Sequence, residues 1–347
     1  MYVVFDSAVL VGDFMLRSIH TQALLAESRD GTHRVAIPEV VFLEVTNKWR
    51  EQAAIFLEKT GLQAERYGLR DIQVNLPDLE KAATDYRTWL LERLNEHKVL
   101  WLDIPDVDHR VLLKSAVEKR KPFSENGAGY RDALVWESVK KPALDSGAEV
   151  YLVSHDKGDF TKDDQLHPDL VANLEEAGIQ QDRVVFLYSC KTAVESLMTP
   201  ARETLESFKS RLEYDTDYRD AVANSIVQHL DTSLQVADQG LRYGETVRAI
   251  EGIELPLDNY KPLNAWVIGR DLIGVELEVE AQIDVVVDVE ASRYPDPVQV
   301  FDQSLPGQGA PQSETKTVKG LIMVQLVLSK NQGNAINDAY AQVTSLS

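Results

Sequence analysis

Five acidic residues in the first half of the chain are placed where their side chains could act together. Each of them either follows an apolar run of strand-forming residues or lies in a helical pattern. Clustered carboxylates attract hard cations such as Mg²⁺ or Mn²⁺, which lower the pKa of bound water and neutralise charge on a phosphate. The residues are Asp6, Glu44, Asp132, Asp156 and Asp159.

Four of these acids, taken singly, also have a structural explanation. Asp6 could cap the segment that follows it, and Asp132 in a first helical turn would complement the helix dipole. Asp156 and Asp159 could be turn residues beside Gly158. It is their joint occurrence that indicates a site.

Glu44 is different, because its segment is apolar on nearly every side. Its neighbours include Val41, Leu43 and Val45. Burying a carboxylate there is costly unless a cation or hydrogen bonds compensate. Two compensations are open at this point: an ion pair with an Arg or Lys, or a metal ion.

A parallel sheet would bring these acids together. Short apolar runs alternate with helical patterns, which is typical of a parallel sheet with crossover helices. The carboxyl ends of parallel strands meet at one edge, where ligands bind. The predicted strands cover residues 2–5, 34–37, 99–104, 150–154 and 184–188, and the marked helices cover 38–58, 78–97, 107–119 and 130–139.

The pattern changes after the single cysteine, Cys190, whose expected role is core filler. Two helical stretches, 193–212 and 218–238, predict a helical connector. Every odd position from 275 to 289 is apolar and the even positions are mostly Glu, Gln or Asp, which predicts a long strand or a bent strand pair with one buried face. Another strand is expected over 317–328, after a loop at 304–313. We therefore divide the chain into a first domain at 1–191, a helical connector at 192–245 and a mainly antiparallel β (α+β) domain of unknown role at 246–347.

Composition limits the function classes. The formal net charge is −20, which disfavours broad electrostatic binding to duplex DNA. No apolar run approaches the roughly 18 residues that span a bilayer, and the first residues lack a signal-peptide pattern. We expect a cytoplasmic protein with no membrane partner.

The joint pattern of acids resembles the PIN-domain nuclease family. Asp6 closes the first strand, Glu44 lies in a Pro-x-x-x-x-x-Glu helix, and Asp132 comes early in a later helix. The closing strand ends in Ser-His-Asp-Lys-Gly-Asp-Phe at 154–160. Within the family, the chain looks like a larger bacterial PIN-like subgroup with a C-terminal extension, and the resemblance covers 1–191. It implies an α/β domain with a five-stranded parallel sheet flanked by helices.

The resemblance also implies an activity and roles for residues. It implies a Mg²⁺- or Mn²⁺-dependent phosphodiester hydrolase, an endonuclease and most readily a ribonuclease, that takes RNA or single-stranded DNA at an acidic cleft. The catalytic residues would be Asp6, Glu44, Asp132 and Asp156. The metal ligands would be the same four and Asp159, with the fourth position open between Asp156 and Asp159. Substrate contacts would come from Arg131, Lys121 and Ser154.

Wider roles follow only at the level of the family. Such nucleases serve as toxins, in RNA processing and in defence systems, and a homodimer is a family habit. The C-terminal domain would regulate or assemble the protein and take a protein partner. The alternative is a catalytically silent PIN-like scaffold or sensor, which the presence of all four acids argues against. A phosphatase would need a second Asp two residues after the first, and Ala8 stands there.

Overall fold

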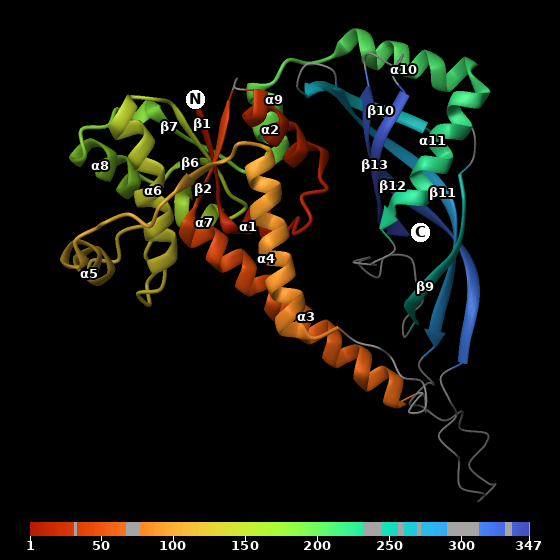
Figure 1. The fold of residues 1–347 in the computed structure, drawn as a ribbon, viewed down its shortest axis with the longest axis horizontal. Helices are drawn as coiled ribbons and strands as arrows, with labels where there is room; N and C mark the ends of the chain where they lie inside the picture. Colours follow the sequence, from red (N-terminus) through yellow and green to blue (C-terminus); the bar gives the residue numbers. More distant parts are fainter. Residues whose placement is uncertain are drawn as a thin grey trace, which may run out of the picture. The chain divides into compact units, whose positions relative to one another are not determined.

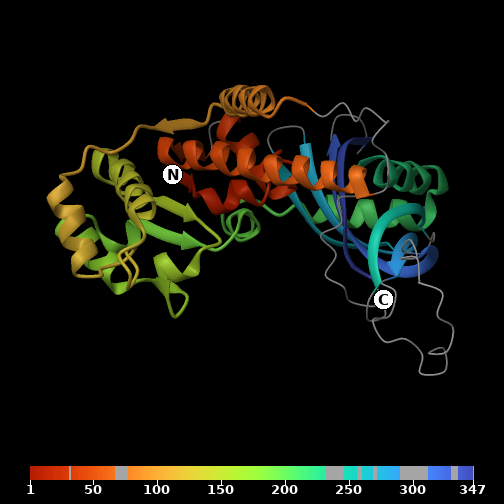
Figure 2. The same cartoon turned by 90° about the horizontal axis from the view of Figure 1, so that it is seen from below.

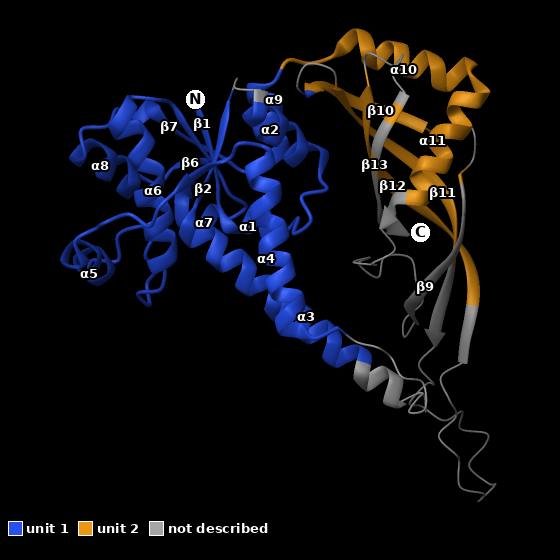
Figure 3. Cartoon of the chain, viewed as in Figure 1, with its two compact units in different colours: residues 1–198, 268–270 blue, residues 199–267, 271–347 orange. Residues whose placement is uncertain are grey.

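The protein forms two compact units, residues 1–198 with 268–270 and residues 199–267 with 271–347 (Figure 3). The first is called unit 1 and the second unit 2. The computed structural model describes residues 1–30, 33–66, 77–231, 245–255, 260–268, 272–289, 312–329 and 335–346.

Unit 1 is built on a five-stranded sheet in which every pair of neighbours is parallel, in the order β3-β2-β1-β4-β7. This confirms the predicted fold class. The strands are β1 (Tyr2–Phe5), β2 (Arg34–Pro38), β3 (Leu100–Leu102), β4 (Val150–Val153) and β7 (Val184–Leu187). Chain crossovers on either side of β1 place its carboxyl end at the centre of the edge where loops converge.

Helices flank this sheet (Figures 1 and 2). Residues of the central strands, such as Val4, Ala36 and Leu152, have no solvent exposure. Strands covered on both faces read as continuous apolar runs, which is why their positions were predictable. The helices are α1 (Ser7–Val11), α2 (Ile19–Asp30), α3 (Glu39–Arg66), α4 (Leu79–Glu96), α5 (His109–Val117), α6 (Tyr130–Ser146), α7 (Lys157–Phe160), α8 (Pro168–Glu176) and α9 (Cys190–Leu197).

Local signals explain the ends of the helices that matter for the site. Asp78 caps α4 by accepting a hydrogen bond from the Lys81 backbone N–H at 2.8 Å. Helix α6 begins after Gly129 and ends at Gly147, both with positive φ. It runs seven residues past the predicted end at 139 and includes Pro142. A proline removes one helical hydrogen bond, and here the helix tolerates that loss.

Unit 2 packs two helices against a six-stranded sheet ordered β10-β11-β12-β13-β8, with β9 paired to β11. Strands β11 and β12 are antiparallel over 18 residue pairs, from Leu272↔Ser329 to Val289↔Gln312. Residues of the alternating segment, such as Val275 and Leu277, are fully buried. The elements are α10 (Arg202–Tyr214), α11 (Thr216–His229), β8 (Leu230–Asp231), β9 (Glu245–Glu254), β10 (Tyr260–Ile268), β11 (Leu272–Val289), β12 (Gln312–Ser329) and β13 (Ala335–Leu346).

The helices of residues 192–245 differ from the predicted connector. Phe208 of α10 and Val222 of α11 are fully buried in the same hydrophobic core as β11 and β12. Helix α9 instead belongs to unit 1. Apolar spacing marks a helix but does not say which partner covers its face, so the separate connector was wrong. The predicted loop at 304–313 lies outside the described residues, apart from 312 and 313, which belong to β12.

No helix in the described ranges is long and apolar enough to cross a membrane.

Candidate active site

Three neighbouring strands of unit 1 end side by side. Phe5, Val153 and Leu187 are in register across β1, β4 and β7. Two backbone hydrogen bonds continue this alignment beyond the strands: Asp6 N–H donates to Val153 O at 3.0 Å, and Ser154 N–H donates to Leu187 O at 3.1 Å. The residue after each strand end therefore lies at one edge of the sheet.

Asp6 is the buried centre of this edge, with 3 % of its surface exposed. It occupies the N-cap position of α1, but its side chain makes no capping hydrogen bond. Instead Asp6 Oδ2 accepts a hydrogen bond of 2.6 Å from the Ser154 hydroxyl. Burial raises the pKa of Asp6, the Ser154 hydrogen bond opposes that shift, and repulsion from Glu44 and Asp156 adds to it. Capping therefore does not explain this aspartate.

The Ser154 hydroxyl makes hydrogen bonds to two parts of the site, Asp6 and the loop that carries Asp156. Its Oγ donates to Asp6 and accepts a hydrogen bond of 3.0 Å from the Asp156 backbone N–H. The residue is fully buried. The sequence predicted Ser154 as a substrate contact; the structure makes it a group that positions Asp6 and the loop of residues 154–160.

Glu44 comes from α3, and its side chain is 14 % exposed. Its Oε1 lies 2.5 Å from Nη1 of Arg131, whose side chain is 60 % exposed. Of the two compensations open from the sequence, the ion pair is therefore present. Because Arg131 is largely in solvent, it can exchange this partner for a ligand at little desolvation cost.

Asp132 lies in the first turn of α6, beside Arg131. The pKa of Asp132 is raised to about 6. Partial burial is the largest cause, and repulsion from other acids contributes the rest, in the decreasing order Asp6, Asp159, Glu44 and Asp156. This carboxylate thus feels all four of the other predicted acids. Side chains from four separate segments converge on one region of negative potential.

Asp156 and Asp159 have different partners. Asp156 is exposed and caps α7, accepting a hydrogen bond of 3.3 Å from the Asp159 backbone N–H. Asp159 Oδ1 lies 3.2 Å from Nζ of Lys121. Asp156 is coupled to Asp6, while Asp159 acts more strongly on Asp132. The choice of a fourth ligand between them stays a prediction.

The acids fit a hard cation by their chemistry, though not by their present spacing. Among the described residues, no three His, Cys, Asp or Glu side chains stand close enough to hold an ion. Arg131 and Lys121 hold Glu44 and Asp159 in ion pairs. The donor set is entirely carboxylate, however, and the pKa values of Asp6 and Asp132 are raised, first by burial and then by repulsion from the other acids.

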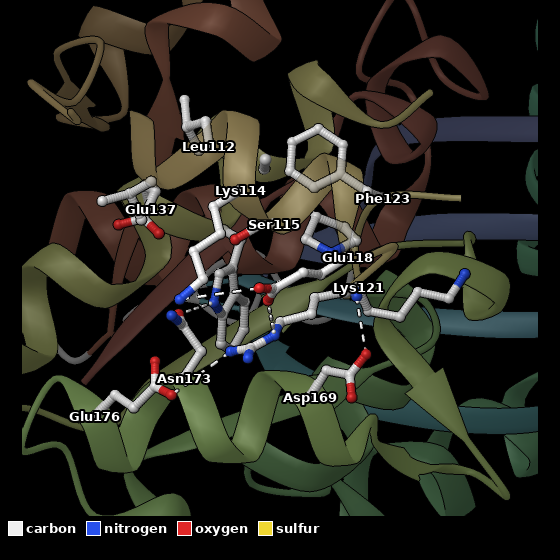
Figure 4. A pocket seen from close by; sticks show the side chains of 15 residues that line it. Leu112, Lys114, Ser115, Glu118, Lys121, Phe123, Glu137, Asp169, Asn173 and Glu176 are labelled. Atoms are coloured by element: carbon white, nitrogen blue, oxygen red, sulfur yellow. Dashed lines mark hydrogen bonds and ion pairs between the residues drawn. The ribbon is translucent and has the colours of Figure 1, made fainter. Parts of the chain in front are cut away.

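A cavity of about 250 Å³ adjoins this region and is lined by α5, α6, α8 and the segment around Lys121 (Figure 4). The Lys121 backbone N–H donates to Asp169 Oδ2 at 3.0 Å on the cavity side, while its Nζ contacts Asp159. Arg120 pairs with Glu118 at 2.8 Å and Glu176 at 3.7 Å. Lys121 thus contacts both the carboxylate cluster and this cavity, whose lining includes the ion pairs of Arg120.

Sequence reasoning did not single out Tyr188, which follows β7 at the same edge. Its ring lies 4.6 Å from Lys157 Nζ and 5.9 Å from the His155 ring. The signal was available, since Tyr188 ends the fifth predicted strand as Asp6 ends the first.

We expect Asp132→Asn to stabilise the metal-free protein at pH 8 by about 1 kcal/mol and to have no such effect near pH 4. An acid whose folded pKa is raised, here from 3.8 to about 6, destabilises the fold fully only above the folded value, and the penalty disappears as pH falls toward 3.8. The expected gain in stability is smaller than the full pKa change would give, because Asp132 is partly exposed and the helix dipole favours its charge.

Thermal melting in EDTA at pH 4 and pH 8 measures this effect. Asp145→Asn, at an exposed position of the same helix, is the matched control and should change neither melting temperature. A wild type more stable than Asp132→Asn at pH 8 would show that the acids do not repel one another in solution.

One family model matches the chain: the model of the PIN domain covers residues 3–160. No curated protein and no solved structure gives a significant match. The matched residues contain β1 from Val3 onward, all of β2, β3 and β4, and all five acids of the site. Unit 1 therefore carries a PIN domain, a nuclease-like fold, over residues 3–160.

Proposed function

We propose that this protein is a Mg²⁺- or Mn²⁺-dependent nuclease that hydrolyses phosphodiester bonds in RNA or single-stranded DNA. PIN domains are generally nucleases. The observation that carries the proposal is the convergence of acids from three other segments on Asp132, whose pKa they help burial to raise to about 6. Uncompensated carboxylates at the carboxyl edge of a parallel sheet are suited to a hard cation.

Each side chain has a proposed task. Asp6, held by Ser154, is the central ligand, and Glu44, Asp132 and Asp156 or Asp159 complete the donor set. When bound, the cation supplies charge neutralisation at the phosphate and a lowered pKa for water. Arg131 and Lys121 are proposed to contact substrate phosphates, because each already lies beside an acid of the cluster and so beside the bound backbone.

The remaining assignments are also proposals. Unit 2 would regulate or assemble the enzyme, with a homodimer or another protein as its partner. A catalytically silent scaffold is the second candidate, and the ion pairs of Glu44 and Asp159 favour it, because both acids have an internal counter-charge.

A cleavage assay tests the proposal. Labelled single-stranded RNA, single-stranded DNA and duplex are incubated with the protein in Mn²⁺ or in EDTA. We expect the wild type to cleave at least one single-stranded substrate in Mn²⁺ and not in EDTA. We expect Asp132→Asn to cleave no substrate. No cleavage of any substrate, together with no rise in melting temperature on addition of Mn²⁺, would favour the silent scaffold.

A further inference from the structure

An exposed aromatic pair lies beside the carboxylate cluster without being part of it. Tyr188, the residue after β7, is 47 % exposed. The His155 ring is also exposed, with its centroid 5.9 Å from that of Tyr188 and the two planes inclined by 51°. Tyr188 is therefore about half accessible to solvent beside the exposed His155, and the two rings form an aromatic surface next to the cluster.

A cation holds this surface in place. Lys157 Nζ lies 4.6 Å from the Tyr188 ring centroid, within cation–π range. The same Nζ lies 2.8 Å from Asp164 Oδ1, so the ammonium is oriented from two sides. Ring and positive charge are therefore adjacent, which is the combination that binds single strands: stacking for the base and charge for the phosphate.

The distance from the acids suits a nucleotide chain. Leu187 is in register with Val153, which is in register with Phe5, so the residues after these strands are successive neighbours along the edge. Two strand spacings of about 4.8 Å place the backbone of Tyr188 roughly 10 Å from that of Asp6. A single strand covers this distance within a few nucleotides.

Net charge explains why such a surface would be needed. At −20 the chain gains little from general attraction to phosphates. Stacking on an aromatic ring does not depend on net charge, and every base has a face to offer. Bases in a duplex are already stacked on one another, whereas those of a single strand are available.

We propose that Tyr188, supported by Lys157 and His155, is a stacking platform for a base of single-stranded nucleic acid within a few nucleotides of the cleaved bond. The inference deepens the proposed nuclease function and rests on it for the location of that bond. It makes Tyr188 a determinant of specificity for single strands over duplexes, acting on substrate affinity.

Fluorescence anisotropy on the full chain tests the platform without requiring cleavage. Labelled 10-mers of RNA, DNA and duplex are titrated in Mn²⁺ against the Asp6→Asn protein, with and without Tyr188→Ser. We expect Tyr188→Ser to weaken single-strand binding by about 5-fold to 100-fold, the effect typical of losing one base stack. Tyr188→Phe should restore it, and Tyr214→Ser, at an exposed tyrosine of α10, should change nothing.

Two readouts separate stacking from structural damage. The slope of log Kd against log salt should stay the same in Tyr188→Ser, because no phosphate contact is lost. An abasic position in place of the base that stacks on Tyr188 should weaken binding to the protein that keeps Tyr188. The same abasic oligonucleotide should bind Tyr188→Ser as tightly as the intact oligonucleotide does.

The outcomes are distinct. Unchanged single-strand affinity in Tyr188→Ser, or equal affinity for duplex and single strand, overturns the platform even if the wild type cleaves. Tyr188-dependent binding by a wild type that cleaves nothing supports the platform and overturns the nuclease.

Discussion

Asp6→Asn should abolish cleavage while leaving the fold intact. Asparagine has the shape of aspartate and keeps an oxygen that can accept the 2.6 Å hydrogen bond from Ser154. It removes the buried negative charge at the centre of the cluster. We expect a loss well beyond the roughly 10-fold to 100-fold that follows removal of an outer partner of a metal site.

The same variant should be at least as stable as the wild type in EDTA at pH 7. Burial raises the pKa of Asp6, so its ionised form opposes folding above that raised value and has no effect below 3.8. Mn²⁺ should raise the melting temperature of the wild type and have no effect on Asp6→Asn, because the central ligand is missing.

Initial cleavage rates and melting curves check both parts. Asp85→Asn, an exposed position on α4, serves as the matched control and should behave as wild type in each measurement. Cleavage by Asp6→Asn within a few-fold of wild type would remove Asp6 from the proposed machinery.

Phe160→Ala should cost about 3–5 kcal/mol of stability, the usual penalty for emptying a buried phenylalanine site. Phe160 has no exposure, and its ring lies 6.3 Å from that of Phe186 with an interplanar angle of 27°. It is the last residue of α7, directly after Asp159. The truncation therefore also releases the loop that carries Asp156 and Asp159.

Urea denaturation followed by tryptophan fluorescence measures the loss, since four of the five tryptophans lie in unit 1. Phe56→Ala is the matched control, because Phe56 is 66 % exposed on α3 and should change stability by no more than about 0.5 kcal/mol. Equal effects of the two truncations would mean that Phe160 does not anchor the loop.

The sheet was predictable because its signal is local. Strand β1 was predicted at residues 2–5 and observed there, and β2, β4 and β7 differ by one residue at their ends. Burial on both faces requires an unbroken apolar run, which can be read directly. Helix α2 was not assigned a range, because its residues show no strong amphipathic pattern.

The hydrogen-bond and ion-pair partners of the site residues were harder to predict from the sequence. The sequence predicted Asp156 as a turn residue or a ligand, and the structure makes it the N-cap of α7, a relation over three residues. The ion pair of Glu44 with Arg131 joins residues 87 positions apart, and many cations could have filled that role. Burial of Ser154 is likewise set by the neighbouring strands. Which acids converge can be inferred from strand ends; which partner each one takes depends on the packed structure.

Formal charge gives the two ion pairs a further meaning. Five carboxylates against the two cations of Arg131 and Lys121 leave a local charge of −3 when every acid is ionised. One divalent ion reduces this to −1, and an arriving phosphodiester would restore it to −2. On the proposed function, Arg131 and Lys121 would act as exchangeable counter-ions. A bound cation would replace them as the counter-charge of Glu44 and Asp159, which would free both side chains for the phosphates and make substrate binding and ion binding favour each other.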